Sequence, residues 1–161
     1  MYLWIDPWIR KLWYAILDEK GSIVDAGIVL QNAESPTRHD QFMRLYNIYS
    51  FFLDIFTTHQ IKQVCIEKLF FTSWNQSNAE FVYGVRWALI ALAYEHNAWV
   101  LEYAPVELKK AITGNGKAGK MLVQQTIMKL MKLQNLPAYN DAADALGLAY
   151  LSWKQRAKLG K

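Results

Sequence analysis

The first thirty residues form three apolar blocks separated by short polar stretches, a pattern that predicts three strands. Tyr2–Ile5 reads as a short apolar strand, and Lys11–Leu17 and Ile23–Leu30 follow it. The polar residues 18–22, which include Gly21, favour a turn between the second and third strands. Because the connections are short, we expect the three strands to form an antiparallel meander.

Beyond residue 36 the apolar spacing changes to that of a helix. Thr37–His59 is predicted to be helical, and a strand is expected at Ile61–Glu67. The apolar positions of the helix recur every three or four residues: Phe42, Leu45, Ile48, Tyr49, Phe52 and Ile55. A helix between two strands implies a crossover connection, so we expect the fourth strand to lie parallel to its neighbour.

The remaining pattern alternates helix and strand and completes an α/β domain. The expected elements are a helix at Ser77–His96, a strand at Trp99–Tyr103, a short helix at Ala104–Thr113, a helix at Lys120–Leu133 and a last helix at Asn140–Lys158. This order predicts a mixed five-stranded sheet with helices on both faces. The length of 161 residues suits a single domain, with a core at about 1–153 and a short basic C-terminal tail.

The stretch Ala79–Ala93 is apolar nearly all round. Its apolar side chains are Phe81, Val82, Val85, Ala88, Leu89, Ile90, Leu92 and Ala93. A helix that lies on its own sheet needs only one apolar stripe, so the second face predicts a partner, most simply in a two-fold homodimer through helix 77–96. Gly84 and Ala88 would let two helices approach closely. Burial of both faces within one chain is the alternative.

Composition excludes several classes of protein. A hydrophobic content of 53% and an aromatic content of 14% argue against disorder. No apolar run reaches the roughly 20 residues that span a bilayer. A lone cysteine, Cys65, fits a reducing compartment, and we expect a cytoplasmic protein with a buried, inert thiol.

Charge is distributed unevenly along the chain. Residues 1–104 hold 8 Lys and Arg against 11 Asp and Glu, whereas residues 105–161 hold 10 against 3. Such a basic C-terminal third indicates a polyanion partner, with an ordinary solvated helix surface as the alternative.

Four acids fall at positions where carboxylates could converge. Asp6 ends the first strand and Glu67 ends the fourth, so parallel pairing would bring both to one sheet edge. Asp141 and Asp144 are three apart on one helix face. Four converging carboxylates repel one another unless cations lie between them, and oxygen ligands favour Mg²⁺ or Mn²⁺. Taken singly, each acid could instead cap a turn or a helix or lie on the surface.

The set Ile5-Asp6-Pro7, Ile66-Glu67 and Asp141-Ala142-Ala143-Asp144-Ala145-Leu146 resembles the RuvC family of Holliday junction resolvases, in motif order and strand context. The resemblance covers about residues 1–153. It implies an RNase H-like fold and a dimeric endonuclease that makes paired symmetric nicks in four-way DNA junctions, in recombination and repair. It also implies that Asp6, Glu67, Asp141 and Asp144 are the catalytic residues and hold two Mg²⁺ ions, and that branch-migration motor proteins are possible partners.

Two loops are candidate DNA contacts. Phe70 follows Glu67, and in RuvC-like proteins an aromatic residue at this position packs against bases near the junction centre. In the glycine-rich loop the resemblance places lysines near the DNA backbone, which gives Lys109 and Lys120, with Lys117 as a further candidate. Burial of Phe70 and simple solvation of the lysines are the alternatives.

The segment from Gly114 to Lys120 also matches the start of a nucleotide-binding phosphate loop. That motif requires Ser or Thr at the next position and a strand before the loop, whereas Met121 follows here and a helix is expected before it. Glycine amides and lysines suit phosphate groups without implying ATP. Two rival functions stay open: another RNase H-like nuclease, acting on branched DNA or RNA–DNA hybrids, and a catalytically silent junction-binding protein.

One departure from the family pattern concerns the residues around Asp6. RuvC-like proteins usually carry glycine where this chain has Trp4 and Trp8. Two bulky rings beside the Asp-Pro pair would narrow the site or alter how DNA approaches, although neither removes a ligand.

Overall fold

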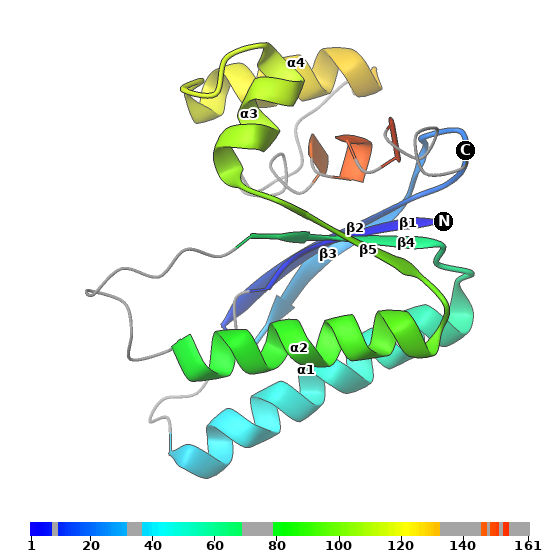
Figure 1. Ribbon diagram of the computed structural model, residues 1–161, viewed down its shortest axis with the longest axis vertical. Coiled ribbons are helices and arrows are strands. Elements are labelled where there is room, and N and C mark those ends of the chain that lie inside the picture. The colour runs from blue at the N-terminus through cyan, green and yellow to red at the C-terminus, as the bar shows by residue number, and fades with distance from the viewer. Residues whose placement is uncertain are drawn as a thin grey trace.

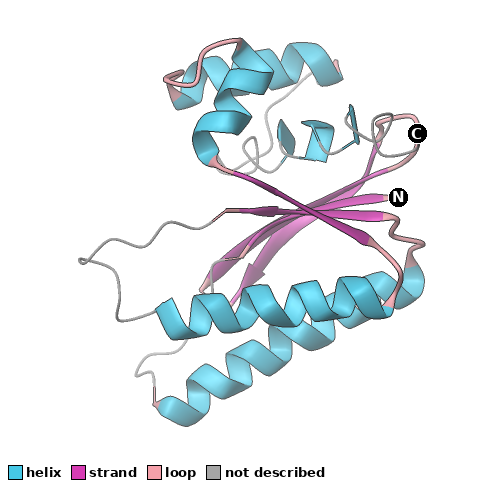
Figure 2. Cartoon of the chain, in the orientation of Figure 1, coloured by secondary structure: helices cyan, strands magenta, loops and turns pink. Residues whose placement is uncertain are grey.

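The computed structural model describes residues 1–7, 10–31, 37–68, 79–132, 146–147, 149–151 and 153–154. Within these ranges the chain forms one five-stranded sheet covered by helices on both faces (Figures 1 and 2). None of the helices in these ranges combines the length and the apolar character that a bilayer-spanning helix requires.

The sheet is mixed, as the sequence predicts. Its strands are β1 (Tyr2–Asp6), β2 (Lys11–Leu17), β3 (Ile23–Leu30), β4 (Gln63–Glu67) and β5 (Trp99–Tyr103). Their spatial order is β3-β2-β1-β4-β5. The first three strands pair antiparallel, whereas β1–β4 and β4–β5 are parallel. The carboxyl ends of β1, β4 and β5 therefore lie along one edge of the sheet, on the left in Figure 1.

Helices cover both faces of the sheet. They are α1 (Arg38–Thr58) and α2 (Ala79–Glu95) on one face, and α3 (Pro105–Thr113) and α4 (Lys120–Met131) on the other (Figure 1). The helical residues 146–147 and 149–151 lie on the same face as α3 and α4. A capping box starts α1: the Thr37 hydroxyl accepts the Asp40 N–H, and the Asp40 carboxylate accepts the Thr37 N–H. The α3 start is closed in a similar way, because the Glu107 carboxylate accepts the Ala104 N–H at 2.8 Å.

The alternation of side chains along the strands divides the interior into two cores. On β1, Leu3 and Ile5 pack with α1 and α2, whereas Tyr2 and Trp4 pack with α3 and α4. All four are buried, which explains why β1 reads as a continuous apolar run rather than as an alternating one. Asp6 continues the series of Tyr2 and Trp4, so its side chain lies on the face covered by α3 and α4.

Two predicted strand boundaries were wrong by a small amount, and the helices α1 and α3 begin one residue later than predicted. The first strand extends to Asp6, and the fourth begins at Gln63 rather than at Ile61. The Ile61 N–H donates to the His59 carbonyl at 2.8 Å, so the chain is still turning after α1 at that point. The region 133–145 and most of the predicted last helix lie outside the described residues, although 146–147, 149–151 and 153–154 are helical.

α2 uses much of its apolar surface within the chain. Most of its apolar residues are buried, because the helix packs against both the sheet and α1. A side chain at Gly84 would meet Leu45 of α1 at 3.7 Å, so this small residue lies against α1. The large apolar side chains that α2 leaves exposed are aromatic: Tyr83, Trp87 and Tyr94.

Trp4 lies in the second core with 1% of its surface exposed, and its indole Nε1 forms no hydrogen bond with the described residues. A buried N–H without an acceptor costs about 1–3 kcal/mol, whereas the ring itself contributes packing. The Trp4 ring, which replaces the glycine usual in RuvC-like proteins, is therefore part of the hydrophobic core, and its indole N–H has no hydrogen-bond acceptor among the described residues.

We expect Trp4→Phe to change the free energy of unfolding by less than about 1 kcal/mol, because the lost volume is offset by removal of the unsatisfied N–H. Trp4→Ala should cost about 3–5 kcal/mol. Trp153→Phe is the control, since its Nε1 donates to the Glu19 carbonyl at 2.9 Å and the bond would be lost. Urea denaturation measures the free energy of unfolding of all three variants. If Trp4→Phe lowered this free energy more than Trp153→Phe does, the indole N–H of Trp4 would not be an unsatisfied donor.

Candidate active site

The parallel pairing of β1 with β4 determines the position of the first two carboxylates. The register places Leu3 beside Val64, Trp4 beside Cys65 and Ile5 beside Ile66. Continued by one residue, it brings Asp6 beside Glu67, on strands about 4.8 Å apart. Both side chains lie on the face covered by α3 and α4, because they follow Trp4 and Cys65 in the alternation. The two acids are thus neighbours at the carboxyl-end edge of the sheet.

Aromatic residues flank this pair on both sides. Trp13 of β2 is the antiparallel partner of Asp6, and Tyr103 of β5 is the parallel partner of Glu67. Both rings belong to the second core and share the face of the acids. The row Trp13–Asp6–Glu67–Tyr103 thus crosses four strands. The sequence analysis did not assign Trp13 or Tyr103 to the site, since only the strand register reveals that they lie beside the acids.

The two acids are partly buried rather than solvated on all sides. The Oδ1 atom of Asp6 is shielded from solvent, and Asp6 and Glu67 both have intermediate exposure. Burial raises the pKa of the Cys65 thiol well above its usual range, and the negative charge of the nearby Glu67 raises it further. Cys65 is buried and stays protonated, as expected for an inert core thiol.

The other predicted acids, Asp141 and Asp144, lie outside the described residues, as does Phe70. Within the described ranges, no group of three or more potential metal-binding side chains comes together. The chain that follows Asp144 is informative, however: Leu146 and Ala149 are buried in the second core, on the face that carries Asp6 and Glu67.

The donor chemistry of Asp6 and Glu67 fits a hard divalent cation. Both offer carboxylate oxygens, which are the ligands that Mg²⁺ and Mn²⁺ prefer. They are adjacent and share a face, so their mutual repulsion favours a cation between them. The described residues thus supply part of a ligand set and do not by themselves determine how many ions bind.

The glycine-rich loop between α3 and α4 has a defined conformation. Gly114 has a left-handed backbone (φ 78°) and closes α3 through its N–H, which donates to the Lys110 carbonyl at 2.9 Å. The Asn115 side chain accepts the Lys117 N–H at 2.9 Å. Gly119 is the N-cap of α4 and has no side chain, so no side-chain hydrogen bond from the cap residue closes the first turn of α4.

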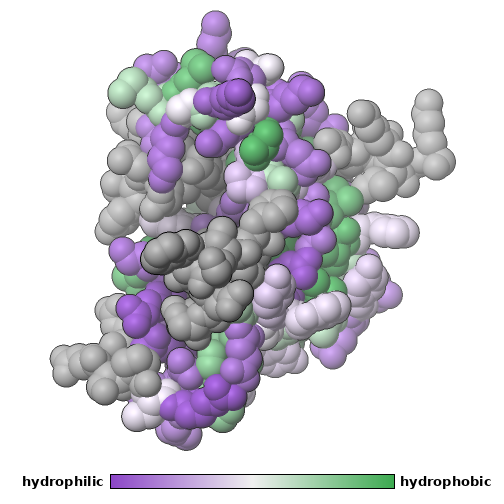
Figure 3. Space-filling model, turned by 60° about the vertical axis from the view of Figure 1, so that its left-hand side comes forward, coloured by the Kyte–Doolittle hydropathy of each residue, from purple (hydrophilic) through white to green (hydrophobic). Residues whose placement is uncertain are grey.

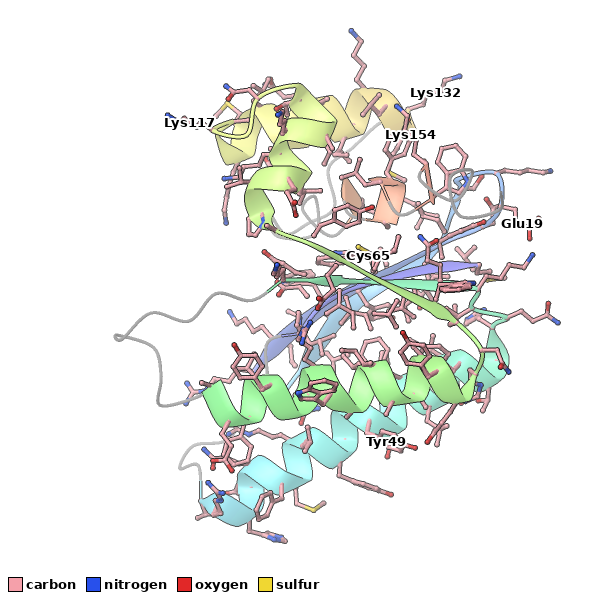
Figure 4. The ribbon with its side chains drawn as sticks, viewed as in Figure 1. Glu19, Tyr49, Cys65, Lys117, Lys132 and Lys154 are labelled. Atoms are coloured by element: carbon pink, nitrogen blue, oxygen red, sulfur yellow. The ribbon has the colours of Figure 1, made fainter. Side chains whose placement is uncertain are left out.

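The lysines of this loop are exposed, whereas Lys109 on α3 is half-buried. Figure 4 shows Lys117 at the tip of the loop, on the side of the molecule where β1 and β4 end. Hydrophilic side chains predominate over α3 and α4 at the upper end of Figure 3, which turns this side toward the reader. A helix precedes the loop, so the strand that a nucleotide-binding phosphate loop requires is missing there.

Comparison with known proteins agrees with this geometry. The family model "Crossover junction endodeoxyribonuclease RuvC" matches residues 2–151. The protein of that name from Gloeobacter violaceus is 33% identical over 155 residues, which cover 94% of this chain and 86% of the relative. Its counterpart from Pseudothermotoga lettingae is 35% identical over 149 residues, covering 91% and 89%.

Solved structures show the same fold. RuvC from Thermus thermophilus superposes with a TM-score of 0.80 at 25% identity, over 99% of this chain and 96% of the other. The same protein in complex with a Holliday junction substrate gives a TM-score of 0.81 at 22% identity, with the same coverage. With its mixed sheet, its pair of strand-end acids and a family match over nearly its whole length, this chain belongs to the RuvC family of crossover junction endodeoxyribonucleases.

Proposed function

We propose that this chain is a Holliday junction resolvase, a structure-selective endonuclease that makes paired symmetric nicks in four-way DNA junctions during recombination and repair. The observation that carries this proposal is the juxtaposition of Asp6 and Glu67 at the ends of adjacent parallel strands, in a chain of the RuvC family. The whole chain, 1–161, acts as a single nuclease domain in this proposal.

The catalytic residues in this proposal are Asp6, Glu67, Asp141 and Asp144. The described pair contributes two oxygen ligands from rigid strands, and the other two acids extend the set from the segment before Leu146. Two bound Mg²⁺ ions, or Mn²⁺ in their place, would supply activation of a water molecule and stabilisation of the leaving oxygen of the phosphodiester. Trp13 and Tyr103 limit access of bulk water from either side of the pair.

DNA binding is assigned to the loops beside this edge. Lys117 and Lys120 present ammonium groups, and the uncapped start of α4 presents amides, a combination that suits a phosphate group. Lys109 on α3 is a further backbone contact in this proposal. Phe70, which lies outside the described residues, is the proposed stacking residue for bases at the junction centre.

The proposal also includes a homodimer, since paired nicks require two active sites. The exposed side chains of α2, Tyr83, Trp87 and Tyr94, recur at helical spacing with the half-buried Ile90 between them. Exposed aromatic residues gathered on one helix face are typical of an interface between proteins. A two-fold axis through this aromatic face of α2 would orient the two active sites toward strands of like polarity.

Asp6→Asn should abolish junction cleavage while junction binding is retained, because a neutral amide no longer supports a cation but does not repel DNA. The measurement is cleavage of a synthetic four-way junction with Mg²⁺, compared with a linear duplex. Asp54→Asn, an exposed carboxylate on α1, is the matched control and should cut normally. Equal cutting of the duplex by the unmodified protein, or cleavage by Asp6→Asn, would contradict the proposal.

Trp87→Ala should shift the protein from dimer to monomer in sedimentation velocity, with the dissociation constant raised at least tenfold, because a central aromatic contact is removed. Trp99→Ala is the control: Trp99 is exposed to 66%, against 63% for Trp87, but lies on the edge strand β5. A monomeric unmodified protein, or equal effects of both substitutions, would refute the α2 interface.

A further inference from the structure

A second basic surface lies at the other end of α4, remote from the carboxyl ends of β1 and β4. Lys20 comes from the β2–β3 turn, Lys132 follows α4, and Lys154 comes from the C-terminal segment. We call these three residues the distal lysine surface. Figure 4 shows Lys132 and Lys154 at the end of the molecule opposite to Lys117.

A depression of about 400 Å³ lies between these elements. Lys20, Lys132, Tyr150 and Trp153 are among the residues that line it. Lys154 is not among the lining residues, but its ammonium lies 6.0 Å from the centre of the Tyr150 ring, next to the depression. The rings of Tyr150 and Trp153 are themselves 5.5 Å apart.

Trp153 fixes the β2–β3 turn to the C-terminal segment. Its Nε1 donates to the Glu19 carbonyl at 2.9 Å, and its ring lies so close to Gly21 that a Cβ there would be 3.0 Å from it. Gly21 also has a left-handed backbone (φ 84°), so a larger residue would be strained as well as crowded. The turn that carries Lys20 is therefore held rigidly beside the segment that carries Lys154.

The acids near this surface are already engaged. Asp18 accepts the backbone N–H groups of Lys20 and Ser22, and these bonds lower the pKa of its carboxyl. The Glu19 carboxylate pairs with the Lys62 ammonium at 2.5 Å. None of the three lysines forms an ion pair with a described residue. Asp18 also attracts Lys20 electrostatically and so offsets part of the positive charge of the distal lysine surface, whereas Lys132 and Lys154 carry the rest.

Lys132 adds a conformational argument. Its backbone is left-handed (φ 54°), at the position after a helix where glycine or asparagine is the usual residue. Glycine would adopt that conformation without the steric strain that a lysine side chain incurs. The residue after α4 is thus a lysine at a position where the backbone favours glycine.

The spacing of the surface matches duplex DNA. Trp13, the register partner of Asp6, lies near the start of β2, and Lys20 follows the end of that strand. At about 3.3 Å per residue, the five residues from Trp13 to Asp18, where the turn begins, span about 17 Å. This distance corresponds to about five base pairs, at about 3.4 Å each. α4 runs alongside for about 18 Å, from Lys120 to Met131.

We propose that the distal lysine surface binds the phosphate backbone of a junction arm, about five base pairs from the point of cleavage. This inference rests on the proposed function, because it requires a DNA duplex arm that leaves the active-site edge and runs along α4 to the distal lysine surface. Lysine ammonium groups suit this role, since they bind phosphates as point charges without reading the base sequence.

The test compares the unmodified protein with the triple variant Lys20→Gln, Lys132→Gln and Lys154→Gln. Hydroxyl-radical footprinting is carried out on a four-way junction with long arms, without divalent cations. We expect protection about five base pairs from the junction centre to disappear in the variant, while protection at the centre stays. Junction affinity should fall about tenfold, and the slope of log K against log salt should fall by about two to three.

Arg38→Gln serves as the control, because it removes one positive charge from α1 on the opposite face of the sheet and should leave the distal footprint in place. At a saturating protein concentration, the single-turnover rate of junction cleavage by the triple variant should equal that of the unmodified protein. An unchanged distal footprint and an unchanged salt slope would overturn this inference. The same outcome is expected if the lysines bind an acidic protein instead of DNA. A protein that neither protects the junction centre nor cuts it would overturn the proposed function itself.

Discussion

The hydrogen-bonded pairing of β1 with β4 is the contact on which the rest of the structure depends. It joins the N-terminal meander to the parallel half of the sheet and places Asp6 beside Glu67. It also fixes which side chains of each strand point to which face of the sheet. Both acids therefore lie on the face covered by α3 and α4, while Leu3 and Ile5 pack against α1 and α2. A slip of one residue in either strand would move one acid to the opposite face and separate the pair.

Much of this arrangement could be predicted from the sequence, because local patterns carry it. The bounds of β2, β3 and β5 were predicted correctly, and a crossover helix before β4 made parallel pairing the expected topology. The partners of a strand or helix were less accessible. Neither the position of Trp13 beside Asp6 nor the contact of Gly84 with Leu45 can be read from periodicity, since both depend on register and on helix packing across the fold.

Trp4, two residues before Asp6, also shows that the packing partners of a residue cannot be read from the sequence alone. The resemblance to RuvC-like proteins suggested that a bulky ring at Trp4 would narrow the site. In the fold Trp4 is enclosed in the second core, and only its N–H is left without a described partner. Its bulk therefore acts on packing between the sheet and the helices above it, while Trp13 and Tyr103 are the rings beside the acids. Trp8 lies outside the described residues.

The position of β1 in the middle of the sheet has a consequence for biosynthesis. The first thirty residues can pair as a meander as soon as they leave the ribosome, but the other edge of β1 stays open until α1 and β4 have been made. That edge belongs to a strand whose residues Tyr2–Ile5 are all buried in the finished protein. An open apolar edge is a template for aggregation, so the β1–β4 pairing also removes an aggregation-prone edge from the chain.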